Sequence, residues 1–140
     1  MRVNEYGDVV PDVTPGPRVR PVELHKAQWL VAARWRRRAA LECKRAGLTF
    51  TEWLVIDALR ELLEEINDAV SQNDLALRSG LRRGNICDLM PSLEKKNLVS
   101  RGPSATGRAL RLFPTDKAYH LLEWLYPRLD AISRPTERAP

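Results

Sequence analysis

Apolar residues recur at helical spacing along most of this 140-residue chain, and an alternating pattern replaces that spacing only near residues 98–113. A repeat of three to four residues is typical of an amphipathic helix, and alternation is typical of a half-buried strand. The sequence therefore predicts a mainly α fold with a small β-hairpin. The expected helices are residues 22–46, a segment capped by Thr49 or Thr51, a short segment capped by Ser71, residues 82–96 and residues 115–126.

The order of these elements predicts a winged helix-turn-helix domain. Ser79 and Gly80 interrupt the pattern between two short helices, which is the arrangement that a helix-turn-helix requires. In such a motif the second helix enters the major groove with its first residues on the base edges. The two expected strands, residues 98–101 and 108–113, would form the hairpin that follows this helix.

Prolines predict where the domain begins and where its helices weaken. Residues 1–21 hold four prolines and two glycines, so we expect an extended arm, followed by a single domain over residues 22–130. Residues 131–140 are expected to form a flexible tail. Pro91 and Pro127 lie within predicted helices, and each is expected to kink or shorten its helix.

Charge is segregated along the chain although the net charge is only +5. Residues 18–46 have a balance of +7, residues 49–74 one of −6, and residues 78–111 one of +6. Positive charge collected around the predicted helix-turn-helix and hairpin favours a polyanionic partner. The arginines at 34 and 36–38 could contact DNA, but a solvated helix face, or pairing with the acids of the next helix, explains them more simply.

Several classes of protein are excluded by composition. No apolar run reaches the roughly 20 residues of a membrane span, and the first residues lack the apolar core of a secretory signal. Two cysteines and two histidines are too few for a disulfide scaffold or a structural zinc site. No GxGxxG, P-loop, GxSxG or HExxH motif is present. We therefore expect a cytoplasmic, non-enzymatic protein with no metal or cofactor.

Three stretches together resemble the MarR family of transcription regulators. They are LTFTEWLVIDAL, SQNDLALRSGLRRGNICDLMPSLEKKNLVSR and GRALRLFPTDKAYHLL, and they lie between residues 48 and 122. The resemblance implies a homodimer that binds double-stranded DNA, with a small-molecule effector in many members. With the apolar stripes of the end helices, it implies dimerisation helices at residues 22–46 and 115–126. The family usually ends with two such helices, whereas this chain has room for one before its polar tail.

The resemblance also assigns candidate DNA-binding residues. Arginine suits guanine and asparagine suits adenine at base edges, and basic residues around them suit phosphates. The family's wing arginine corresponds to Arg108, although the acidic residue common before it is replaced here by the run Ser104–Gly107. The complete candidate set is Arg78, Arg82, Arg83, Gly84, Asn85, Asp88, Arg101, Thr106, Arg108 and Arg111.

Two other functions remain open from the sequence. A winged helix can bind an acidic protein instead of DNA, and a basic one can bind DNA without sequence preference. Two further interpretations concern single residue types: the tryptophans could line a ligand pocket, and Cys87 could sense an oxidant. Filling of the core or of a dimer interface explains them more simply.

Overall fold

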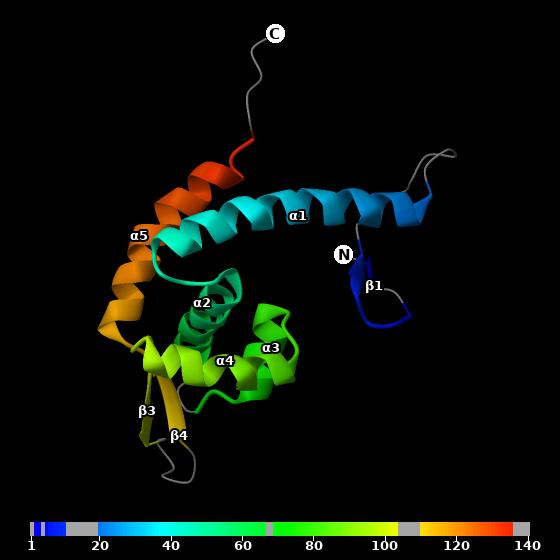
Figure 1. The fold of residues 1–140 in the computed structure, drawn as a ribbon. Helices are drawn as coiled ribbons and strands as arrows, with labels where there is room; N and C mark the ends of the chain where they lie inside the picture. Colours follow the sequence, from blue (N-terminus) through cyan, green and yellow to red (C-terminus); the bar gives the residue numbers. More distant parts are fainter. Residues whose placement is uncertain (1, 4, 11–19, 67–68, 104–109, 136–140) are drawn as a thin grey trace. The chain divides into compact units, whose positions relative to one another are not determined.

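The computed structural model describes residues 2–3, 5–10, 20–66, 69–103 and 110–135. These residues form two compact units, residues 1–37 and 38–140. The described residues contain five helices and two two-stranded antiparallel sheets (Figure 1). In chain order they are β1 (Arg2–Val3), β2 (Val9–Val10), α1 (Pro21–Arg45), α2 (Phe50–Glu65), α3 (Gln72–Ser79), α4 (Arg83–Lys95), β3 (Val99–Pro103), β4 (Leu110–Pro114) and α5 (Asp116–Ser133).

The first unit contains β1, β2 and most of α1. Arg2 pairs with Val10 and Val3 with Val9, and Gly7 takes a positive φ of 82° in the turn between the strands. This pairing lies inside the segment expected to be an extended arm, and the sequence prediction did not include it. Helix α1 begins at Pro21, where the fixed φ of proline suits a first helical residue.

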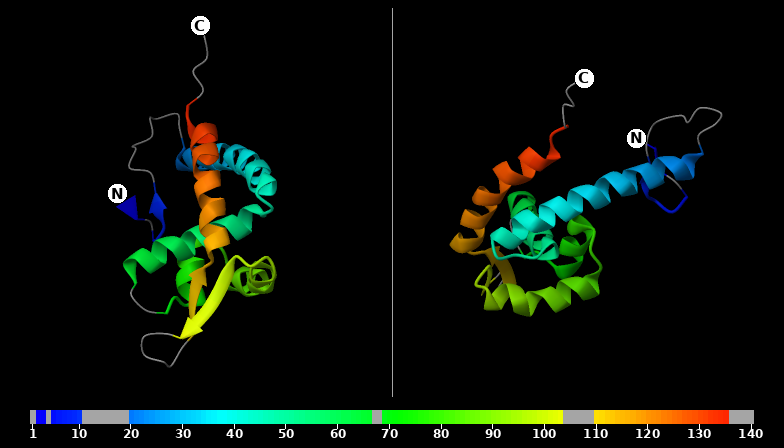
Figure 2. Two further views of the ribbon diagram at one scale, coloured as in Figure 1. Left: turned by 90° about the vertical axis from the view of Figure 1, so that its left-hand side faces the viewer. Right: turned by 45° about the horizontal axis from the view of Figure 1, so that its top comes forward.

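The second unit is built around α2, which contacts α3, α4 and β4 and is hydrogen-bonded to α5 (Figures 1 and 2). Its buried stripe, Val55, Ile56, Leu59 and Leu62, confirms the helical repeat seen in the sequence. The other helices bury Leu75, Ile86, Met90, Leu93, Leu122 and Leu125. Strand β3 pairs with β4 from Val99↔Pro114 to Pro103↔Leu110, so the predicted hairpin is confirmed.

Helix ends follow the capping signals. Thr49 and Glu52 form a reciprocal capping box at the start of α2, and Ser71 and Asp74 form another at the start of α3. Gly80 ends α3 with a φ of 78°, a conformation that glycine adopts without strain. The second unit therefore has the predicted mainly α winged helix-turn-helix fold.

Both internal prolines lie within continuous helices. Helix α4 runs through Pro91 to Lys95, and α5 runs through Pro127 to Ser133. The expectation that the last helix ends at Pro127 is therefore wrong. Both prolines are on exposed positions, where water can bind the carbonyl that loses its N–H partner. Burial of Leu129, which is 4% exposed, favours the extra turns of α5.

A buried carboxylate joins the start of α2 to the end of α4. Glu52 is 1% exposed, and its Oε1 accepts hydrogen bonds from the Lys96 ammonium at 2.7 Å and the Thr49 amide at 2.8 Å. Its Oε2 accepts from the Ser92 hydroxyl at 2.8 Å. Burial alone would raise the pKa of Glu52, but these hydrogen bonds and the charge of Lys96 lower it below its usual value.

We predict that Glu52→Gln lowers the free energy of unfolding at neutral pH by about 1–3 kcal/mol, because a charged acceptor of three hydrogen bonds is lost. The pKa of Glu52 is lower in the folded chain, so its contribution is complete above the unfolded value of about 4.3 and is lost as pH falls through the folded value. Urea titrations from pH 3 to pH 7 measure both effects. If the free energy of unfolding falls as steeply at acidic pH in the variant as in wild type, the role assigned to Glu52 is contradicted.

Candidate nucleic-acid interface

Helices α3 and α4 meet through a tight turn. After Gly80, the Leu81 amide donates to the Ser79 hydroxyl at 3.2 Å, and α4 begins at Arg83. The N-cap residue Arg82 makes no side-chain cap bond, so the first amide groups of α4 have no side-chain acceptor there. The turn therefore presents the start of α4 with arginine side chains beside it.

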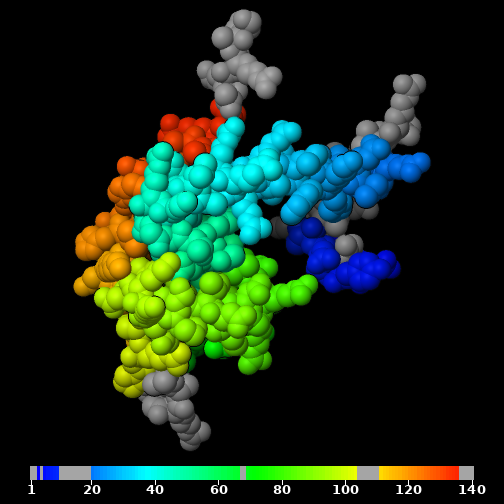
Figure 3. Space-filling model, viewed as in Figure 1, coloured from blue at the N-terminus to red at the C-terminus, as the bar shows by residue number. Residues whose placement is uncertain are grey.

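The exposed side of α4 carries most of the predicted recognition residues. Ile86, Met90 and Leu93 face the core, whereas Arg82, Arg83, Gly84, Asn85 and Asp88 are exposed. A Cβ added to Gly84 would meet no atom of the described residues within 4 Å, so no packing contact among them explains a glycine at that position. Figure 3 shows α3, α4 and β3 side by side as one continuous surface.

The arginines of the hairpin differ in their surroundings. Arg101 donates from Nε to Glu94 of α4 at 2.7 Å, which ties β3 to α4. The Arg111 guanidinium lies over the Phe113 ring at 4.9 Å, on the opposite face of the hairpin. A Cβ on Gly102 would approach Phe113 to 3.1 Å, so this glycine makes room for the ring. Thr106 and Arg108 lie outside the described residues.

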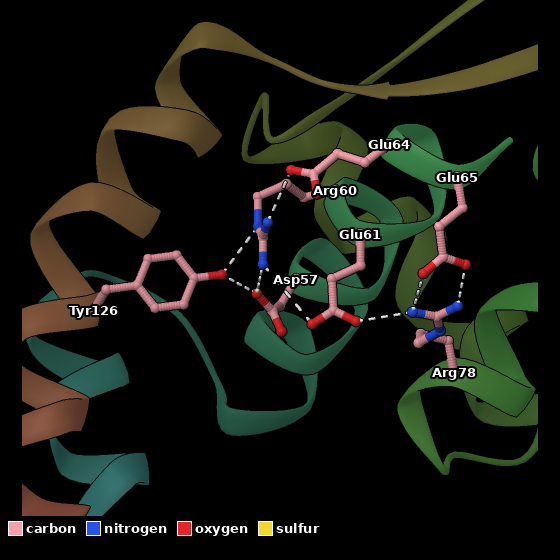
Figure 4. Close-up of polar contacts among 7 residues, drawn as sticks. All are labelled: Asp57, Arg60, Glu61, Glu64, Glu65, Arg78 and Tyr126. Carbon is pink, nitrogen blue, oxygen red and sulfur yellow. Dashed lines mark hydrogen bonds and ion pairs between the residues drawn. The ribbon is translucent and has the colours of Figure 1, made fainter. Parts of the chain in front are cut away.

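Arg78 is directed toward α2. Its guanidinium donates to Glu65 in a two-pronged contact, with one distance of 2.9 Å, and to Glu61 at 3.2 Å (Figure 4). The hydrogen bond from Arg78 lowers the pKa of Glu65. Of the ten candidates, the structure brings Arg83, Gly84, Asn85 and Asp88 together on α4 with Arg82 at its N-cap, and it joins Arg78 and Arg101 to acidic partners.

Tyr126 of α5 forms a polar cluster with α2 that sequence reasoning missed. Its hydroxyl donates to Asp57 and accepts from Arg60 Nε at 3.0 Å (Figure 4). Burial, and then the hydrogen bond to Asp57, raise the pKa of Tyr126. Helical spacing placed these residues on amphipathic helices, but no pattern in one sequence indicates that Asp57 and Tyr126 meet across 69 positions.

The two cysteines occupy different environments. Cys43 is buried, and burial together with the nearby Glu42 raises its pKa to about 11, so the thiol stays protonated at neutral pH. Cys87 is exposed on α4, and its thiol donates to the Gln72 side chain at 2.7 Å.

The described elements define the winged helix-turn-helix class: a short helix, a tight turn, a helix with an open polar side and a two-stranded antiparallel hairpin. Within that class, a family model described as the MarR family matches residues 46–109 of this chain. The resemblance found in the sequence is thereby confirmed. A search of curated proteins found no match.

Several solved structures share the fold of this chain. A MarR-family transcriptional regulator from Rhodococcus sp. RHA1 is 20% identical, with a TM-score of 0.66, and 83% of this chain matches 79% of it. CouR from Rhodococcus jostii RHA1, bound to p-coumaroyl-CoA, is 21% identical, with a TM-score of 0.67 and coverage of 79% and 75%. The transcriptional regulator MOSR from M. tuberculosis, in complex with DNA, is 17% identical, with a TM-score of 0.55 and coverage of 83% and 78%.

Within the described ranges, none of the helices combines the length and the apolar character needed to cross a membrane.

Proposed function

We propose that this protein is a sequence-specific, double-stranded DNA-binding transcriptional regulator that acts as a homodimer. The observation that carries the proposal is the open side of α4, where two arginines, a glycine and an asparagine occupy the first turns after the helix-turn-helix turn. These are the positions from which a recognition helix reaches base edges. The match of residues 46–109 to the MarR family model and the DNA complex of MOSR support the same function.

The experiment for this proposal is fluorescence anisotropy with DNA from upstream of the protein's own coding region and with random duplex of equal length. We expect tighter binding to the upstream DNA and a steep loss of affinity as salt rises, because phosphate contacts release counterions. Equal affinities would leave binding without sequence preference, and no binding to either duplex would favour the protein-interaction alternative.

We further propose that α4 reads bases while the wing binds phosphate. Arg83→Ala or Asn85→Ala should cost about 1–3 kcal/mol on the cognate site and relax base preference there. Arg108→Ala, in the segment between β3 and β4, should weaken cognate and random DNA about equally and reduce the salt slope by about one. A change of base preference in Arg108→Ala with uniform losses in the other two variants would reverse these roles.

Gly84 offers a test of how closely a ligand approaches α4. Gly84→Ala should stabilise the fold by about 0.4–1 kcal/mol, because alanine favours the helix and its methyl group meets no atom in the part of the chain that the structure describes. If DNA lies against this turn, the same methyl group should weaken cognate binding. Thermal melts and anisotropy together measure both effects. A more stable variant with unchanged affinity would place the DNA farther from Gly84.

The proposed dimer uses the apolar positions that the chain leaves exposed. On α1, Val22 and Trp29 lie seven residues apart and therefore on one face, and they are 67% and 65% exposed. On α5, Tyr119 and Trp124 are 40% and 36% exposed. A second copy would cover such positions. Light scattering at micromolar concentration should give about twice the 16.0 kDa of one chain, and a particle of 16.0 kDa would contradict the dimer.

The remaining parts of the proposal follow from the family. MarR-family regulators are generally not enzymes, and we propose that this one is likewise non-enzymatic and acts in the cytoplasm. The p-coumaroyl-CoA bound to CouR supports a small-molecule effector for this chain as well.

A further inference from the structure

Arg78 is in the last turn of α3, the first helix of the helix-turn-helix, and its guanidinium is paired with two glutamates of α2. Its two terminal nitrogens contact both carboxylate oxygens of Glu65, and one of them also donates to Glu61. Glu61 and Glu65 are four residues apart, so their carboxylates extend from the same side of α2. The planar guanidinium is suited to such a two-pronged contact.

The acids that hold Arg78 belong to a longer polar chain. Glu61 also lies 3.8 Å from the Arg60 guanidinium, and Arg60 donates to Asp57 at 3.0 Å and to the Tyr126 hydroxyl. The contacts therefore run from α5 through α2 to α3 without a gap (Figure 4). An isolated exposed ion pair contributes little to stability, whereas a two-pronged pair within a network fixes the position of the groups that it joins.

Electrostatics oppose a phosphate contact by Arg78. Two carboxylates surround one guanidinium, so the local balance is negative where a phosphate would have to approach. A phosphate would have to displace both glutamates and would be repelled by them. An arginine paired with two carboxylates adds little to the counterion release of DNA binding, although the position of Arg78 in the sequence makes it a candidate DNA contact.

We propose that Arg78 is a positioning residue for DNA recognition: by binding Glu61 and Glu65 it fixes α3 against α2, and thereby sets the direction of α4, without contacting DNA. The inference rests on the proposed DNA-binding function. Because α3 and α4 pack against each other and are joined by the short Gly80 turn, a change in α3 alters the placement of α4 in the groove. Specific binding should suffer from the loss of Arg78, whereas attraction to DNA of any sequence should not.

Anisotropy titrations across salt on cognate and random DNA distinguish positioning from contact. Arg78→Ala should lower cognate affinity by about 2- to 30-fold, the range for residues that influence a site without touching its ligand, with no change in salt slope. Arg78→Lys should lose nearly as much, since an ammonium keeps the charge but cannot bind both glutamates in this way. A phosphate contact would instead reduce the slope by about 0.9 in the alanine variant and be largely kept by lysine.

Glu65→Gln should change the affinity for cognate DNA in opposite directions, depending on whether Arg78 is a positioning residue or a phosphate contact. If Arg78 positions α3, the variant should bind cognate DNA more weakly, because the guanidinium loses its main partner. If Arg78 is a phosphate contact restrained by Glu65, the variant should bind more tightly with a steeper salt slope. Glu64→Gln is the matched control: it removes the same charge one residue away, from a carboxylate that pairs with Arg60 and not with Arg78. Tighter binding by Glu65→Gln than by Glu64→Gln would overturn the proposal.

Hydrogen exchange of the DNA-free protein tests the same contact independently of function. Exchange of the α3 amides should accelerate in Arg78→Ala and Glu65→Gln and remain as in wild type in Glu64→Gln. Unchanged exchange in the first two variants would refute the positioning role even if they bind DNA poorly. Absence of DNA binding by the wild-type protein, with the exchange result as expected, would refute the proposed function and the DNA part of the inference while confirming the contact.

Discussion

The placement of the proposed recognition helix depends on one buried carboxylate. Glu52 has a place in the capping box of α2 and also accepts hydrogen bonds from Ser92 and Lys96 at the end of α4. A charge that is 1% exposed is stable only when its oxygens are bound, so the two helices cannot separate here without leaving it unpaired. The open side of α4 follows from this attachment, because its buried side is held against α2.

Basic charge in this fold has two uses that composition does not separate. Arg82 and Arg83 are exposed at the start of α4, whereas Arg78 and Arg101 pair with acids on neighbouring elements. In the sequence all four belong to the same stretch of balance +6. The difference arises from the acids of α2 and α4 that face the paired arginines. Counting basic residues in a helix-turn-helix therefore overstates the charge that can reach a nucleic acid.

Local signals predicted most of the fold, and five of the ten candidate site residues lie together and exposed at the start of α4. Periodicity, the Thr49 and Ser71 caps and the Gly80 break are properties of neighbouring residues, and they placed the helices within a few positions. The continuation of α5 beyond Pro127 was missed because it depends on burial of Leu129 in the folded domain. The cluster of Asp57, Arg60 and Tyr126 was missed for a similar reason, since its members meet only through packing of α2 against α5.

The start of α5 is bound to the segment that follows α4. The Thr115 hydroxyl donates to the Asn97 carbonyl at 2.6 Å, the Thr115 amide to that of Leu98 at 3.0 Å, and the Lys117 ammonium to that of Lys96 at 2.8 Å. Three bonds across one junction make a stiff joint between α5 and α4. If α5 holds two copies together as proposed, this joint fixes the separation of their recognition helices. The spacing of operator half-sites, about 34–36 Å in a symmetric site, would then limit binding as strictly as the identity of their bases.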